Sequence, residues 1–180
     1  MKPKFKTTRI RRPFLVSSAI MLCMSAPAMA QTNNLWTGAT SSEWTDATNW
    51  SLGVVPTKTG NYHAVINTNT GNLATITLGI IAPVDIVVGT GAGTNGRLDH
   101  LAGDASTGST NSMYVGAAGG AGTYNLANTG GTGGTHTTFA TGSGSMTVNG
   151  GTLWVGSGTG SNGTLNVNTT GTLAAGVAMN

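Results

Sequence analysis

The sequence has 180 residues, which fits one domain or two small ones, and only 7% of them are charged while 29 are glycine. The formal net charge of +3 comes from residues 1–12, which hold six of the eight Lys and Arg; the rest has two bases against five acids, a net charge of −3. This distribution excludes a nucleic-acid binder that neutralises phosphates through a basic face, and the low charge argues against charge-driven disorder.

Residues 1–30 are predicted to be a secretory signal peptide. A basic stretch, MKPKFKTTRIRR, precedes an apolar run at about 14–24, and Ala28-x-Ala30 then supplies a small-x-small cleavage pattern. We therefore expect cleavage between Ala30 and Gln31. The apolar run is too short to span a bilayer, so an N-terminal membrane anchor is the less favoured interpretation.

The leader also bears on export route and redox chemistry. Arg11 and Arg12, followed by Pro-Phe-Leu, resemble the core of a twin-arginine signal, so export by the general secretory route or the twin-arginine route both stay open. The single cysteine, Cys23, lies within the leader. The mature chain would therefore contain no disulfide, zinc–thiolate site or thiol nucleophile.

Residues 31–60 hold three of the four tryptophans, Trp36, Trp44 and Trp50, within 15 residues. We predict that this segment is a structural N-terminal cap. The open end of a stacked-strand fold exposes apolar core and an unpaired strand edge, and large aromatic rings cover such an end well. A sugar-binding aromatic platform is the alternative interpretation.

The remaining residues, 61–180, contain short segments in which apolar and polar residues alternate. This period of two predicts strands that bury one face, and Gly or Asn-Gly pairs after most of them predict tight turns. No helical pattern follows the leader. The positions predicted to face inward are Ala74, Ile76 and Leu78; Val84, Ile86 and Val88; Met113 and Val115; Met146 and Val148; Leu153 and Val155; and Leu165 and Val167.

The segments also repeat. Residues 88–98 (VGTGAGTNGRL) match residues 155–165 (VGSGTGSNGTL), and residues 115–124 are a copy one residue shorter. A five-residue strand with one apolar face cannot bury that face alone, whereas stacked coils line such faces into one narrow core. The pattern predicts an all-β elongated β-solenoid, a right-handed parallel β-helix, with an antiparallel β-sandwich as the alternative. Residues 130–138 (GGTGGTHTT) are predicted to be a loop that leaves one coil.

The tryptophan segment reads W-T-G-x-x-S-x-x-W-x-D-x-x-N-W-x-x-G-x-x-P, which resembles the start of bacterial autotransporter passenger domains. The Gly-rich copies that begin at Ile86, Met113 and Leu153 are similar to autotransporter-associated β-strand repeats. The resemblance covers nearly all of 31–180. It implies a β-helical passenger on the outer surface of a Gram-negative cell or secreted from it; such passengers usually act in adhesion, aggregation or biofilm, though some are enzymes. The motif residues are Trp36, Gly38, Ser41, Trp44, Asp46, Asn49, Trp50, Gly53 and Pro56.

The sequence departs from this family at its end. Autotransporters carry a C-terminal membrane β-barrel, which needs many strands of about 9–11 residues, and here the repeats run to GTLAAGVAMN without such strands. We expect either a piece of a longer gene product or a secreted relative that lacks the barrel, with membrane attachment only through such a barrel. An open last coil would favour self-association.

The sequence predicts no catalytic residue, metal site or cofactor. A hydrolase needs a nucleophile, a base and an orienting group within hydrogen-bond reach, and no G-x-S-x-G elbow accompanies the three histidines. The nearest titratable group is Asp99 and His100 with Arg97 and Asp104. We interpret it as a polar turn between coils, since adjacent strand residues face opposite sides.

One binding feature is predicted. In the three copies, the residue before the valine of the Val-Gly pair is Val87, Tyr114 or Trp154, opposite in parity to its inward neighbours. Coils stacked in register would align these residues in an outward stripe, extended by Thr75 or Thr147, with Tyr114 and Trp154 as candidate contacts for a sugar or a partner protein. Packing under a loop or a neighbouring sheet is the alternative.

The sequence therefore predicts an exported, non-catalytic β-solenoid at the outer cell surface or in the medium, with the periplasm as the alternative location. It would act as an adhesin or structural spacer. A carbohydrate-binding module, or the non-catalytic N-terminal part of a larger β-helical enzyme, are the alternative functions. The expected partners are glycans or proteins of a host or of neighbouring cells.

Overall fold

The computed structural model describes residues 30–126, 143–148, 150–176 and 178–180. Most of the predicted signal peptide, including Ala28, and the predicted loop at 130–138 lie outside these residues. The described chain is all-β, as predicted, apart from one short 3₁₀ turn, η1 (Ala47–Asn49). Within it, no helix is long and apolar enough to cross a membrane.

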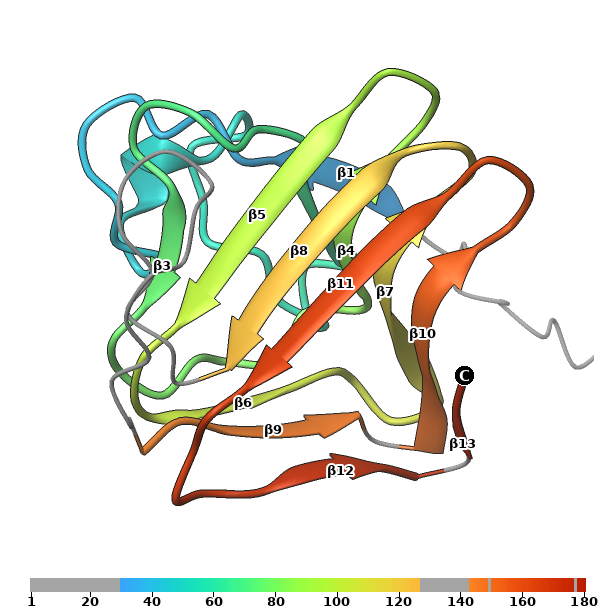
Figure 1. The fold of residues 1–180 in the computed structure, drawn as a ribbon. Helices are drawn as coiled ribbons and strands as arrows, with labels where there is room; N and C mark the ends of the chain where they lie inside the picture. The colour runs from blue at the N-terminus through green and yellow to red at the C-terminus, as the bar shows by residue number, and fades with distance from the viewer. Residues whose placement is uncertain (1–29, 127–142, 149, 177) are drawn as a thin grey trace, which may run out of the picture.

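The described strands form three sheets (Figure 1). Neighbouring strands within each sheet are all parallel, which also agrees with the prediction. The first sheet has the order β1 (Thr32–Leu35), β2 (Tyr62–Ile66), β4 (Ile86–Thr90), β7 (Asn111–Ala117), β10 (Gly150–Ser157) and β13 (Ala178–Met179). The second has the order β3 (Ala74–Ile76), β5 (Asn95–His100), β8 (Ala121–Leu126) and β11 (Asn162–Val167). The third has the order β6 (Asp104–Ser106), β9 (Ser145–Val148) and β12 (Leu173–Ala175).

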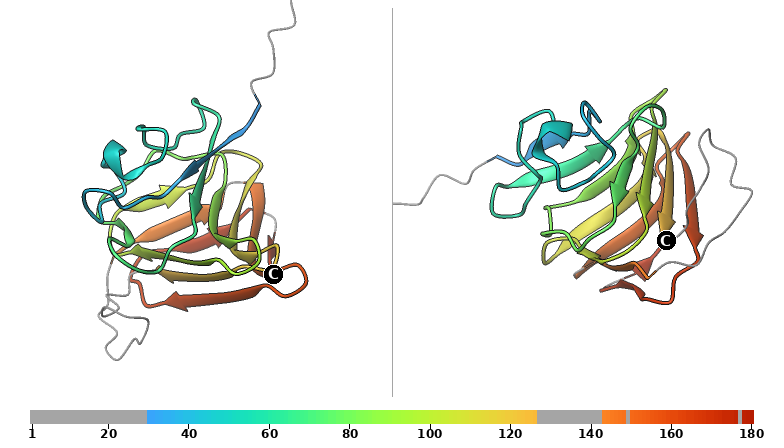
Figure 2. Two further views of the ribbon diagram at one scale, coloured as in Figure 1. Left: turned by 90° about the horizontal axis from the view of Figure 1, so that it is seen from above. Right: turned by 90° about the vertical axis from the view of Figure 1, so that its left-hand side faces the viewer.

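The chain visits the three sheets in a fixed order. It runs through β4, β5 and β6, then β7, β8 and β9, then β10, β11 and β12, and each strand lies beside its counterpart from the previous pass. Figure 2 shows the strands of successive passes stacked one beside the next. Parallel neighbours require such long connections, because a tight hairpin can join only antiparallel strands.

The inward side chains line up between passes and form one continuous apolar core. In the first sheet the aligned set includes Ile86, Met113 and Leu153, all fully buried. Two predicted inward residues are exposed instead. Leu78 lies beyond the end of β3 and is 64% exposed, while Val167 lies on β11, the edge strand of the second sheet, and is 50% exposed.

The glycines of the repeat lie where the chain turns from the first sheet to the second. Gly89 and Gly116 have φ of 72° and 74°, a region that favours glycine. A Cβ on Gly89 would overlap the carbonyl oxygen of Ala121, and one on Gly122 would overlap that of Val88. The Gly-rich spacing of the repeat therefore reflects backbone segments packed against each other at this corner.

Two glycine substitutions distinguish the stability cost of overpacking this corner from the cost of a positive φ. Gly89→Ala and Gly93→Ala both place alanine at positive φ, but nothing lies within 4 Å of a Cβ at Gly93. We expect Gly93→Ala to cost about 1 kcal/mol of the free energy of unfolding, and Gly89→Ala about 1–3 kcal/mol more, because it also overpacks the corner. Urea-induced unfolding measures both; equal losses would show that conformation alone sets the glycine pattern.

Candidate functional site

The strand register aligns a row of apolar side chains on the outward face of the first sheet. Leu35, Val65, Val87, Tyr114 and Trp154 are consecutive neighbours on β1, β2, β4, β7 and β10, and we call them the apolar row. Tyr114 and Trp154, the two candidate binding residues, thus lie side by side.

The proposed extension of this row was wrong. Thr75 lies on β3 of the second sheet and Thr147 on β9 of the third, so neither residue joins the apolar row. The alignment of the Gly-rich copies identified neighbours within one sheet. It could not show where the chain turns from one sheet into the next.

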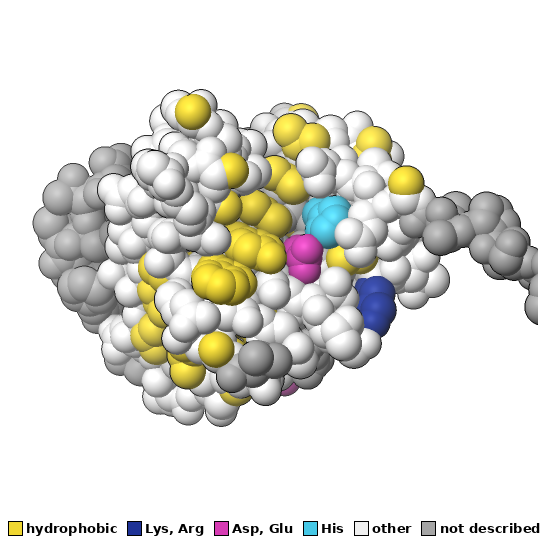
Figure 3. All heavy atoms as spheres, turned by 90° about the vertical axis from the view of Figure 1, so that its right-hand side faces the viewer, with side chains coloured by type: hydrophobic (Ala, Val, Ile, Leu, Met, Phe, Trp, Pro, Cys, Tyr) yellow, Lys and Arg dark blue, Asp and Glu magenta, His cyan; other side chains and the backbone are white. Residues whose placement is uncertain are grey.

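The apolar row is partly accessible. Leu35 is 43% exposed, Val65 is buried, and Val87, Tyr114 and Trp154 are half-buried. Figure 3 shows hydrophobic side chains gathered on this side of the molecule, with a histidine and an acidic side chain next to them. A partly exposed aromatic pair on a sheet face can contact a ligand without unfolding any part of the chain.

A second set of side chains, which the sequence reading missed, borders the apolar row. Two residues before the members on β2, β4, β7 and β10 are His63, Asp85, Ser112 and Thr152, which we call the polar row. Asp85 directly precedes β4, and the pairing of β10 with β7 shifts register between Gly150 and Leu153, so direct contacts, and not the strand register alone, connect this row. The signal was present as the segments HAV, DIV, SMY and TLW, each of which puts a polar residue two positions before a member of the apolar row.

Hydrogen bonds hold the polar row in place. His63 Nδ1 lies 3.1 Å from Asp85 Oδ2, and Asp85 Oδ1 accepts the Ser112 backbone N–H at 2.7 Å. Ser112 Oγ accepts the Thr152 backbone N–H at 3.2 Å, and His63 Nε2 lies 3.0 Å from Gln31 Oε1. Among the described residues, the side-chain partners of His63 are thus Asp85 and Gln31, and neither partner atom is a hydroxyl.

The group of Arg97, Asp99, His100 and Asp104 is divided between the two faces of β5 and the start of β6. Asp99 faces outward and receives Arg97 Nε and Nη2 at 2.9 and 2.8 Å. His100 faces the core. Adjacent residues do face opposite sides, but they lie in a strand and not in the expected turn. No cluster of three or more His, Cys, Asp or Glu that could hold a metal ion occurs in the described parts of the chain.

His100 is fully buried, and burial lowers its pKa below the ordinary value of 6.5. Its Nε2 lies 2.9 Å from the Gly103 carbonyl oxygen and its Nδ1 2.9 Å from the Tyr124 hydroxyl. A neutral ring satisfies both contacts, because Nε2–H donates to the carbonyl while Nδ1 accepts the Tyr124 proton. Burial also raises the pKa of Tyr124, which keeps that proton in place.

The lowered pKa of His100 predicts how stability changes with pH. The unfolded chain binds a proton at His100 more readily than the folded chain, so this contribution is complete above the unfolded pKa of 6.5 and is lost as pH falls toward the lowered folded value. We expect the free energy of unfolding to fall between about pH 7 and pH 5. His100→Gln should flatten this slope, as measured by urea-induced unfolding across this pH range; an unchanged slope in His100→Gln would contradict the assignment.

The three tryptophans of residues 31–60 are buried, each with at most 5% of its surface exposed. Trp50 lies edge-on to both others, with ring centroids 5.1 Å from Trp36 and 4.8 Å from Trp44. Their indole N–H groups are partly satisfied, since Trp50 Nε1 donates to the Trp44 carbonyl and Trp36 Nε1 to the Asn72 carbonyl, both at 2.9 Å. In this arrangement the rings offer almost no surface to a ligand.

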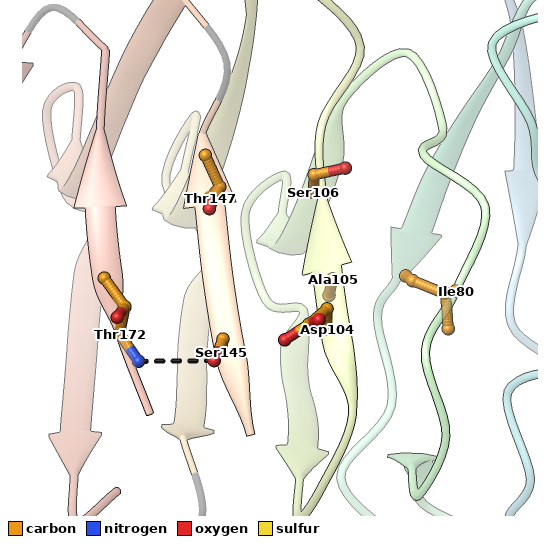
Figure 4. Close-up of a pocket in the computed structure, with 7 residues that line it drawn as sticks. All are labelled: Ile80, Asp104, Ala105, Ser106, Ser145, Thr147 and Thr172. Carbon is orange, nitrogen blue, oxygen red and sulfur yellow. Dashed lines mark hydrogen bonds between the residues drawn. The ribbon is translucent and has the colours of Figure 1, made fainter. Parts of the chain in front are cut away.

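The outward face of the third sheet carries a shallow hollow of about 520 Å³. Asp104, Ser145 and Thr172 lie along one side of it, and the Thr172 backbone N–H donates to Ser145 Oγ at 3.3 Å (Figure 4). The hollow has one exposed carboxylate and no aromatic side chain, so the first sheet offers the stronger candidate site. Its lining residues are Ile80, Asp104, Ala105, Ser106, Ser145, Thr147 and Thr172.

Comparisons with known proteins found no matching family model, no matching curated protein and no matching solved structure.

Proposed function

We propose that this chain is an exported β-solenoid module of the autotransporter-passenger type that acts as an adhesive contact at the bacterial outer surface. The observation that carries the proposal is the apolar row, in which Tyr114 and Trp154 lie side by side and partly exposed on parallel strands. A surface of this kind fits a contact role, because partly exposed aromatic side chains supply much of the affinity in recognition sites.

The solenoid part of the proposal, a right-handed parallel β-helix, is supported by the repeated order of the three sheets. Each pass through them adds one strand to each, in register with the pass before. The cap is supported by the position of residues 31–60. The Trp44 backbone N–H donates to the Thr75 carbonyl and the Thr75 N–H donates to the Ser42 carbonyl, both at 2.8 Å, so this segment covers the outer edge of β3.

Export rests on the leader pattern and is tested directly. The full 180-residue chain with a C-terminal tag, expressed in a Gram-negative host, should yield a processed protein beginning at Gln31 outside the cytoplasm, as read by N-terminal sequencing of each cell fraction. Ala30→Lys should block processing, while loss of export in Arg11→Lys with Arg12→Lys would assign the twin-arginine route. An unprocessed wild-type chain confined to the cytoplasm would overturn the proposal.

Adhesion is tested with beads coated with the processed chain. We expect them to bind bacterial cells on the order of tenfold better than beads carrying Tyr114→Ala with Trp154→Ala, because those two rings form the exposed centre of the contact. Leu78→Ala with Ile81→Ala is the matched control, since these side chains are 64% and 71% exposed away from the row. Equal binding by all three proteins, each shown to be folded by thermal unfolding, would exclude the row as the adhesive surface.

A further inference from the structure

We infer that the ligand of the first sheet's outward face is a neutral carbohydrate chain, an inference that rests on the adhesive function proposed above. Its sugar rings would lie against the apolar row, and their hydroxyl groups would bond to the polar row. Four properties of this face lead to that ligand: its two-sided chemistry, its prearranged polar groups, its low charge and its spacing.

On the outward face of the first sheet, apolar and polar side chains lie close together. Each member of the polar row lies two residues before a member of the apolar row, which is about 6.5 Å along an extended chain. A pyranose ring has the same character, with C–H groups on its faces and hydroxyl groups around its edge. An amphipathic partner helix would present an apolar stripe about 100° wide. Part of that stripe would lie against the polar row, so this face does not match it.

The polar row offers both donors and acceptors in fixed positions. Asp85 is held by His63 and by the Ser112 backbone N–H, yet each of its carboxylate oxygens has a further lone pair for a sugar hydroxyl. Ser112 and Thr152 add hydroxyl groups that can donate or accept. Because hydrogen bonds already fix the carboxylate, binding orders few additional side chains, and this lowers the entropic cost of association.

Charge distinguishes a neutral ligand from an acidic one. Lys58 and Arg97 are the two Lys and Arg side chains of the described residues. Arg97 pairs with Asp99 on the second sheet, and Lys58 Nζ contacts the Ser109 hydroxyl. Asp85 is the carboxylate of the polar row. An acidic polysaccharide would therefore meet a carboxylate here without a clustered cationic partner, whereas a neutral chain meets no such repulsion.

The spacing of the row suits a polymer. Neighbouring strands lie about 4.8 Å apart, a distance comparable with the length of one sugar unit. A linear chain lying across the strands would place successive rings over Val87, Tyr114 and Trp154, which are consecutive in register. The row thus offers several equivalent contacts to a repeating ligand.

Affinity electrophoresis of the processed chain tests the inference with four soluble polysaccharides: hydroxyethylcellulose, galactomannan and dextran, which are neutral, and polygalacturonate, which is acidic. We expect at least one neutral polymer to retard the protein and polygalacturonate to have no such effect. Tyr114→Ala should weaken retardation at least about tenfold, and Asp85→Asn should also weaken it. Asp104→Asn, which alters an exposed carboxylate on the third sheet, is the matched control. The inference is overturned if none of the neutral polymers retards the wild-type chain.

Tryptophan fluorescence locates the binding surface. Trp36, Trp44 and Trp50 are buried, so acrylamide should quench chiefly Trp154, and the bound neutral polymer should protect it. Trp154→Phe keeps an aromatic ring, so it should retain retardation in the gel but lose the quenchable signal. Retardation without protection of Trp154 would place the carbohydrate elsewhere and contradict the inference.

The bead assay separates this inference from the adhesive function itself. Target cells are treated beforehand either with periodate, which cleaves vicinal diols of sugars, or with a protease. Binding that is lost after periodate and kept after protease supports the carbohydrate ligand. Binding that survives periodate and is lost after protease identifies a protein partner, which overturns this inference and leaves the adhesive function intact. Absence of binding to untreated cells overturns the adhesive function, whatever the gels show.

Discussion

In-register parallel pairing is the constraint on which the rest of this structure depends. It places each side chain beside its counterpart from the next pass, so residues at equivalent positions of successive passes form one row along the stack. Inward positions such as Ile86, Met113 and Leu153 then build a continuous core from strands that are individually too short to have one. The same register forces backbone against backbone at the corners, and Gly89 and Gly122 show what that close approach demands.

The core tolerates a polar residue only where its neighbours satisfy it. His100 occupies the inward position that Ile76 and Leu126 hold on the adjacent strands. Burying an imidazole there is costly unless both nitrogens are bonded, and the Tyr124 hydroxyl and the Gly103 carbonyl supply those bonds. A narrow core between three sheets thus accepts a neutral histidine and resists its protonation.

The sequence correctly predicted features that follow from the alternation of apolar and polar residues along a strand. It did not predict features that depend on where the chain turns from one sheet into the next. Alternation of apolar and polar residues identified the inward face, and alignment of the Gly-rich copies made Val87, Tyr114 and Trp154 neighbours. Thr75 was misassigned because sheet membership is decided at corners that alternation does not mark. The polar row was missed because His63 lies on β2, before the first Gly-rich copy, and only the three-dimensional register brings it to Asp85.

Inward, corner and outward positions differ in how strongly the fold restricts their side chains, and this difference indicates which positions can serve a function. Inward positions are apolar or, as at His100, polar with their hydrogen bonds satisfied, and corner positions are small, so the fold restricts both. Outward positions are less restricted, and Val65 and Val87 show that a β-branched aliphatic residue meets the structural need of the apolar row. Tyr114 and Trp154 occupy equivalent positions with large, partly exposed rings that the strand does not require. Aromatic surface beyond what folding needs, aligned by the register and bordered by bonded polar groups, is the property that makes this face the place to look for a ligand.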